Sequence, residues 1–349
     1  MEDFEIYNIA VEIIHSINQD INEAIYEGVN GSLSLVWSDQ KLFNAWAESC
    51  EDFTKPPKHK IGLHYELARQ IYRDAENYCN FAENELPKEK FQNLFTILQP
   101  APTLPAALSK DDCCYIMFVG ALTWVYFHEL GHLTQEHGYI RKIFSTNTSM
   151  AIHECLANSP NKLDEKNSIL SHVMEIAADF EAITFCIFEL SRHFEGEKLQ
   201  GAIYMFICGI SCIFHRFNEE KLLPSEAQPT GSHPNPIIRM EFNLPHIYEL
   251  LDIFQKPFKL HLDRKGIVHL YYRAAHSSSL FWLWQNTEIQ DIPNYYFLEG
   301  ILNRPDLKPY FRSIISTWDE IEPTITKIRR FGNDFGLIQF TEELREKLM

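Results

Sequence analysis

The spacing of apolar residues predicts a chain built mostly of helices. Isoleucines and a valine recur at helical intervals over residues 3–26, until a Gly-Val-Asn-Gly run at 28–31 breaks the pattern. Residues 32–37 then alternate between polar and apolar side chains, which is typical of a strand at a sheet edge. Helices are expected to follow at about 39–50 and 65–84.

The middle of the chain predicts the longest helices. Ser109 and Asp112 have the spacing of a capping box and mark a helix start, and Gly138 is a suitable stop. Three apolar helices are therefore expected, at about 110–137, 167–193 and 198–217. The polar segment 139–166 is longer than an ordinary connection, so we expect it to cover or border a cleft or to be mobile.

The first of these helices contains an H-E-x-x-H motif, His128-Glu129-Leu130-Gly131-His132. A spacing of four residues places both imidazoles on one helix face, where they can reach a single Zn²⁺. Glu129 follows the first histidine directly and can accept a proton from a metal-activated water. Two histidines on an apolar helix can also be packing residues, so the motif requires supporting context.

Glu175 and Asp179 on the next predicted helix supply that context. They are four residues apart and therefore share a helix face. Glu175 is a candidate third ligand, and Asp179 can accept the free ring N–H of a ligand histidine. The alternative is a solvated stripe that includes Asp179 and Glu181. The neighbouring residues are almost all apolar, and carboxylates in such surroundings are costly unless they are paired or bind a metal.

A third element follows at Ser232-His233-Pro234, with Arg239 six residues after the histidine. With this turn, residues 111–240 resemble the gluzincin metallopeptidases, and among them the M48-like peptidases. The resemblance implies that His128, His132 and Glu175 bind zinc and that Glu129 is the general base. It also implies that His233 donates to the oxyanion and that Arg239 braces the site. Without the resemblance, the sequence predicts only a turn residue at His233 and a surface residue at Arg239.

These elements predict a mainly α (α+β) fold with a zincin-like core, in which an active-site helix, a second ligand helix and a small sheet are combined. Residues 1–105 are expected to form a mostly helical N-terminal region with an edge strand. Residues 106–250 are expected to form the catalytic core. Residues 251–349 are rich in aromatic side chains and are expected to form helices packed on that core.

Composition narrows the function classes. The net charge of −17 and the dispersed Lys and Arg residues argue against nucleic-acid binding. The eight cysteines lack C-x-x-C spacing and the acidic N-terminus lacks signal-peptide features, so a reducing, cytoplasmic location is expected. The uncharged runs 113–127 and 201–214 are shorter than the about 18–20 residues of a membrane span, so they are expected to be core helices.

Other histidines fit a ligand role less well. A metzincin needs a third histidine where this chain has Gly138, and His137 misses that position by one. A catalytic zinc keeps three protein ligands, so His137, His153 and His172 are expected to be surface residues or to support the ligands.

The function expected from the sequence is an intracellular zinc-dependent endopeptidase that acts on a specific protein or peptide substrate. The chain also has a loose likeness to phage-exclusion peptidases, which act on a host protein during infection. The alternative is a non-catalytic, metal-stabilised protein-binding module. The intact Glu129 argues against this alternative, because a binding module needs no general base.

Overall fold

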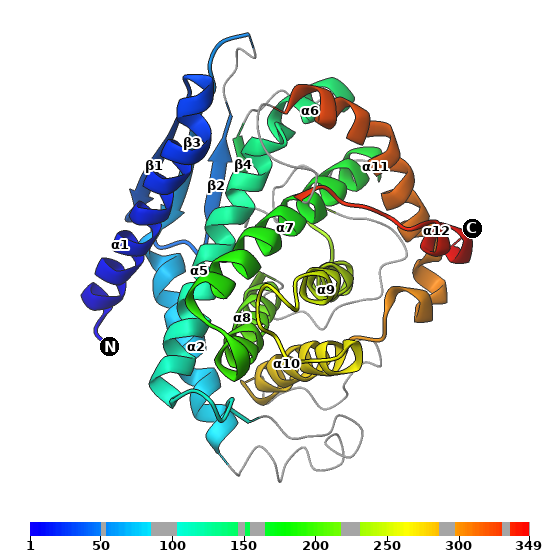
Figure 1. Ribbon diagram of the computed structural model, residues 1–349. Coiled ribbons are helices and arrows are strands. Elements are labelled where there is room, and N and C mark those ends of the chain that lie inside the picture. The colour runs from blue at the N-terminus through cyan, green and yellow to red at the C-terminus, as the bar shows by residue number, and fades with distance from the viewer. Residues whose placement is uncertain are drawn as a thin grey trace.

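The computed structural model describes residues 1–49, 54–84, 103–145, 151–153, 165–217, 231–285, 297–329 and 336–348. It is mostly helical, with a small sheet at one side, so the predicted mainly α (α+β) class is confirmed (Figure 1). The α-helices are α1 Asp3–Ile21, α2 Tyr65–Glu83, α5 Lys110–Thr134, α6 His137–Phe144, α7 Glu165–His193, α8 Gly196–Phe217, α9 Pro236–Ile253, α10 Arg264–Gln285, α11 Lys308–Ile328 and α12 Glu342–Leu348. The strands are β1 Ser32–Ser38, β2 Ala45–Glu48, β3 Lys58–His64 and β4 Ala151–His153.

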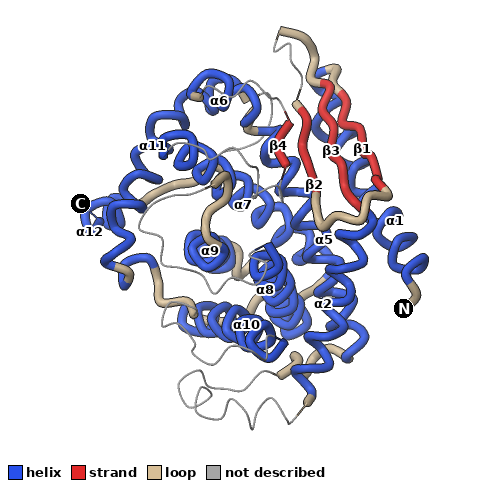
Figure 2. The backbone as a smooth tube through the Cα atoms, turned by 180° about the vertical axis from the view of Figure 1, so that it is seen from behind, coloured by secondary structure: helices blue, strands red, loops and turns tan. Residues whose placement is uncertain are grey.

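The sheet has four strands in the order β1-β3-β2-β4. Strand β1 pairs parallel to β3, whereas β2 pairs antiparallel to both β3 and β4. Figure 2 shows these strands together at one side of the molecule, with α1 beside β1 and α5 beside β2. The strand predicted at 32–37 is therefore confirmed as β1, at the edge of the sheet.

The helix predicted at 39–50 is wrong, because this segment contains β2. Strand β2 is fixed by its neighbour β3. The Trp46 side chain of β2 lies directly over Gly62 of β3. A Cβ atom at Gly62 would lie 2.0 Å from the Trp46 ring, so this close packing requires glycine. A contact between residues distant in sequence thus overrides the local pattern.

Helix α5 begins as predicted and ends earlier than predicted. The Ser109 hydroxyl accepts a hydrogen bond from the Asp112 N–H at 3.1 Å, and the Asp112 carboxylate accepts one from the Ser109 N–H at 3.3 Å. The expected stop at Gly138 is wrong, because that glycine lies inside α6. The chain leaves α5 at Glu136, whose φ of 53° is in the left-handed region.

Helix α5 lies at the centre of the fold and packs against α2, α7 and α8 (Figure 1). By length and composition, both α5 and α8 are apolar enough to cross a membrane, but 83% of the apolar window of each is buried inside the fold. Burial in the core therefore accounts for their apolar sequences, as predicted.

The described part of the C-terminal region consists mainly of helices that pack on the rest of the fold. Helix α10 packs on α8 and α9, while α11 packs on α7. One apolar cluster runs from α1 to α10, and a second joins α7 and α9 to α11 and α12. The division of the chain at residues 105 and 250 stays a prediction.

Candidate metal and catalytic site

His128 and His132 on α5 converge with Glu175 on α7. The two Nε2 atoms are 3.1 Å apart, His128 Nε2 lies 3.3 Å from Glu175 Oε2, and His132 Nε2 lies 3.4 Å from Glu175 Oε1. All three residues are buried. Two imidazole nitrogens and a carboxylate oxygen at this spacing could hold a metal ion.

The spacing fits a small tetrahedral ion. Ligand atoms about 2.0–2.1 Å from a tetrahedral Zn²⁺ are separated from one another by about 3.3 Å. In the cluster the two Nε2 atoms are 3.1 Å apart, and each lies 3.3–3.4 Å from a different oxygen of the Glu175 carboxylate. The three side chains are therefore close enough to one another to hold a small metal ion.

The close approach of α5 and α7 depends on Gly131. A Cβ atom at this position would lie 3.0 Å from the Ala178 Cα and 3.1 Å from the Ala178 carbonyl oxygen. Backbone atoms cannot give way as a flexible side chain can, so glycine lets the two helices meet. Gly131 is the second x position of the H-E-x-x-H motif, and it thus contributes to the site by letting His132 come close to Glu175.

Asp179 contacts His128, the first histidine of the motif. Its Oδ1 atom lies 2.9 Å from His128 Nδ1, on the side of the ring opposite the Nε2 atom that faces His132 and Glu175. Arg239 donates to the same carboxylate from Nε at 2.9 Å and from Nη2 at 2.6 Å, and Asn243 donates at 3.2 Å. Burial raises the pKa of Asp179, but the Arg239 charge and the contacts with His128 and Arg239 outweigh burial and hold it below its usual value.

Arg239 is buried, with 2% of its surface exposed, and its guanidinium lies over the rings of Phe214 and Trp124. Its position is therefore not that of a surface residue. Its Nη2 atom also lies 3.7 Å from Glu175 Oε2, so the arginine faces both Glu175 and Asp179 of α7.

The second histidine of the motif, His132, contacts His137, with the two Nδ1 atoms 2.8 Å apart. His137 is fully buried, and burial lowers its pKa to about 3, so this imidazole is neutral at neutral pH. Sequence spacing gives no signal of this contact, because His137 lies beyond the end of α5 and reaches His132 after the chain has turned at Glu136.

Glu129 and His233 complete the set of predicted site residues. Glu129 is fully buried beside His128 on α5. The turn before α9 brings His233 to the cluster, with its Nε2 atom 3.6 Å from Glu175 Oε2 and its Nδ1 atom 2.9 Å from the Ser232 hydroxyl. The side chain of His233 is 11% exposed, so it borders both the cluster and the solvent.

The sequence matches a known protein family. The family model for peptidase U49 matches residues 33–247, which is more than half of the 349-residue chain and spans every element that contributes to the cluster. The chain belongs to the peptidase U49 family. No curated protein and no solved structure shows a significant match to this chain. Membership in this family supports a proteolytic function and therefore a protein or peptide substrate.

Two further polar residues of α7, His172 and Glu181, are buried and form hydrogen bonds outside the cluster. His172 shares a hydrogen bond of 2.9 Å with the Tyr310 hydroxyl. Glu181 accepts hydrogen bonds from Thr134 at 2.7 Å and from Gln135 at 2.9 Å. The side chain of His153 and most of the insertion lie outside the described residues.

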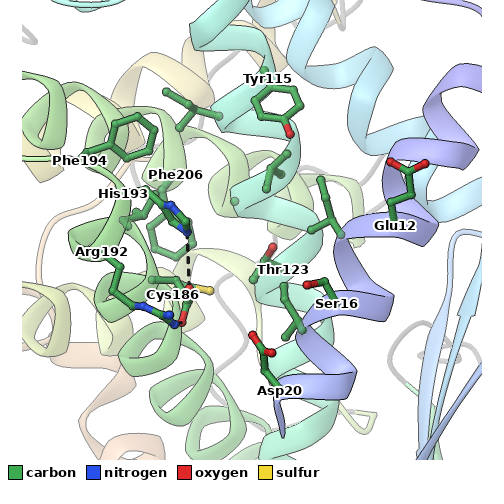
Figure 3. A pocket seen from close by; sticks show the side chains of 17 residues that line it. Glu12, Ser16, Asp20, Tyr115, Thr123, Cys186, Arg192, His193, Phe194 and Phe206 are labelled. Carbon is green, nitrogen blue, oxygen red and sulfur yellow. Dashed lines mark hydrogen bonds and ion pairs between the residues drawn. The ribbon is translucent and has the colours of Figure 1, made fainter.

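The peptidase U49 chain also has a cavity of about 600 Å³ between α1, α5 and α7. Figure 3 shows Glu12, Ser16 and Asp20 of α1 facing Cys186 and Arg192 across this space. The described residues that line it do not include the cluster histidines or Glu175. This cavity is therefore separate from the candidate metal site.

Proposed function

We propose that this chain is a zinc-dependent endopeptidase of the gluzincin type that cleaves a specific protein substrate. The observation that carries the proposal is the convergence of His128, His132 and Glu175 next to Glu129, with the two Nε2 atoms 3.1 Å apart and each 3.3–3.4 Å from one of the two Glu175 carboxylate oxygens. Two histidines with a glutamate are the protein ligands of catalytic zinc in gluzincins, where a fourth position remains open.

The local charges favour a cation. Glu129, Glu175 and Asp179 are buried carboxylates, and they outnumber the guanidinium groups of Arg239 and the half-buried Arg141. Burial lowers the pKa of Arg141, and the attraction of Glu175 opposes that shift. Because buried charge of one sign is costly, a divalent ion held by the three ligands would stabilise this arrangement.

When bound, zinc supplies Lewis-acid activation of the attacking water and of the substrate carbonyl. The protein residues then move the protons and hold the charges. Glu129 accepts the proton of the attacking water at its carboxylate and passes it to the leaving amine nitrogen.

His233 and Arg239 have supporting roles in the proposal. His233 Nε2 borders the cluster and would donate to the oxyanion that forms at the substrate carbonyl. Arg239 would position the site, since it anchors Asp179, and Asp179 contacts His128 on the nitrogen opposite the metal-facing one.

The test compares wild-type protein with Glu129→Gln. Both are incubated with a proteome extract in which the newly formed N-termini are sequenced, and the zinc content of each protein is measured. We expect about one zinc ion per chain in both proteins, as one catalytic site requires, and cleavage by wild type alone.

Glu181→Gln is the matched control, because it also replaces a buried glutamate but lies outside the cluster. It should cleave as wild type does. Undiminished cleavage by Glu129→Gln would refute the role of that residue, and zinc binding without any cleavage by wild type would support the metal-stabilised binding module instead.

A further inference from the structure

The two ligand histidines are supported on Nδ1 by different kinds of group. His128 Nδ1 lies 2.9 Å from the Asp179 carboxylate, whereas His132 Nδ1 lies 2.8 Å from another imidazole nitrogen, His137 Nδ1. His132 and His137 are both buried, with 1% and 0% of their surfaces exposed. The hydrogen bond between them is therefore shielded from solvent.

The protonation of this pair follows from the chemistry of the ligand. A hydrogen bond between two ring nitrogens needs one proton, which one of them must carry. If His132 Nε2 presents its lone pair to a metal, the proton of the neutral His132 ring is on Nδ1. His137 Nδ1 must then be the acceptor, with its own ring proton on Nε2.

We propose that His137 is a positioning residue of the metal site, which accepts the Nδ1–H of His132 and so fixes the ring with its Nε2 lone pair toward the metal. This inference rests on the proposed function, because it requires that His132 be a ligand. His137 would then accept the Nδ1–H of His132, as Asp179 would accept that of His128.

The backbone at Glu136 places His137 for this role. Helix α5 would carry a continuing residue onward along its axis, but the left-handed conformation of Glu136, with φ of 53°, turns the chain at this point. The Tyr139 and Ile140 N–H groups bond back to the Glu136 carbonyl at 2.9 and 3.0 Å, which starts α6 at His137. A glutamate rarely adopts this conformation, so surrounding contacts must hold it.

One such contact comes from the N-terminal part of the chain. A Glu136 carboxylate oxygen lies 3.8 Å from His59 Nε2 on β3, and His59 Nδ1 lies 2.9 Å from the Tyr26 hydroxyl. Tyr26, His59 and Glu136 are all buried. The sheet and the segment after α1 thus hold the turn that carries His137, which links the N-terminal elements to the geometry of the second ligand.

The experiment measures zinc affinity by competition with a chromogenic chelator, for wild type, His137→Leu and His137→Asn. Leucine retains apolar bulk and removes the acceptor, while asparagine retains an acceptor near the position of Nδ1. We expect His137→Leu to bind zinc about 10–100-fold more weakly, as with other partners of metal-bound histidines, and His137→Asn to recover most of that loss. Co²⁺ substitution gives a second readout, in which the visible absorption bands of His137→Leu should shift and those of His137→Asn should resemble wild type.

The matched control is His246→Leu, which also removes a buried imidazole. The hydrogen-bond partner of His246 is the Thr184 hydroxyl and not a proposed ligand histidine. It should keep wild-type zinc affinity and the wild-type Co²⁺ spectrum. Wild-type affinity in His137→Leu would overturn the inference, as would equal weakening in His137→Leu and His137→Asn, since that pattern indicates lost packing. If His137→Leu fails to fold, His137→Ala serves in the same comparison. Failure of wild type itself to bind zinc would overturn the proposed function, which distinguishes the two failures.

Discussion

Arg239 holds Asp179 with two parallel hydrogen bonds, from Nη2 to Oδ1 at 2.6 Å and from Nε to Oδ2 at 2.9 Å. The Oδ1 atom is also the one that lies 2.9 Å from His128 Nδ1. Arg239 on α9, Asp179 on α7 and His128 on α5 thus form one buried chain of charged and polar groups. A paired guanidinium and carboxylate in the interior fix each other's orientation, and through Asp179 this order reaches the ligand ring.

Replacing Arg239 by methionine should destabilise the fold, because Asp179 would remain buried without its cation. We expect a loss of about 3–5 kcal/mol in the free energy of unfolding, measured by chemical denaturation of the metal-free protein. The double variant Arg239→Met/Asp179→Asn should recover part of the loss. If the double variant is as unstable as Arg239→Met, the missing packing of the arginine stem on Phe214 is the cause rather than the charge.

Glu175 and Asp179 should have separable effects on the metal. Glu175→Ala removes a proposed ligand and should abolish stoichiometric zinc binding. Asp179→Asn leaves the three ligands in place and should weaken binding by about 10–100-fold. Zinc content after dialysis and chelator competition measure the two effects, and full zinc retention by Glu175→Ala would require a different third ligand.

His233→Ala should lower kcat by about 10²–10³ with little change in KM, because an oxyanion donor acts mainly in the transition state. Zinc content should be unchanged, since His233 is not one of the three ligands. Measuring kcat, KM and Tm on a single preparation separates this role from a structural one. A lower Tm with full kcat per folded molecule would show that His233 only shapes the turn before α9.

Glu181 should make stability depend on pH. Burial raises its pKa from 4.5 to about 7, although the hydrogen bonds from Thr134 and Gln135 oppose the shift. The folded state therefore holds a proton that the unfolded state releases near pH 4.5, so the contribution of Glu181 to stability is complete below that pH and is lost as the pH rises through about 7.

Glu181→Gln should remove this dependence. The stability of the variant relative to wild type is expected to increase by up to about 3 kcal/mol between pH 5 and pH 8, as the size of the pKa shift implies. Urea denaturation in the presence of a chelator at several pH values measures the difference without a contribution from metal binding. A constant difference between the two proteins over this range would show that Glu181 titrates normally.

Gly131→Ala should disturb the contact between the two ligand helices. The added methyl group would meet the backbone of Ala178, and overpacking of this kind costs about 1–3 kcal/mol. Zinc affinity should also fall, because His132 and Glu175 would be separated. Gly28→Ala is the control, since a Cβ atom there has nothing within 4 Å, and it should change neither Tm nor zinc affinity.

The sequence predicted the parts of the site that depend on local spacing. His128 and His132 share a helix face because they are four residues apart, and the same spacing places Glu175 and Asp179 together on α7. The start of α5 was also predictable, since the Ser109 capping box is a local interaction.

The features that sequence reasoning missed depend on contacts between distant segments. Strand β3 and its pairing with β2 follow from the fit of Trp46 over Gly62, which no local pattern records. The turn at Glu136 was missed because His59 on β3 contributes to it, and the contact between His132 and His137 depends on that turn. Local propensity would have continued the helix to Gly138, the residue that usually ends one.

Residues 120–134 of α5 are all buried, and the H-E-x-x-H motif lies within that stretch. Fraying at a helix end or movement of a surface loop does not expose such a segment, so its amide hydrogens are expected to exchange with deuterium only when the whole domain opens. The free energy of exchange measured at His128 to His132 should then equal the global free energy of unfolding. The proposed metal site should thus open only when the chain unfolds, and a substitution that lowers the stability of the core should lower the free energy of exchange at the motif by the same amount.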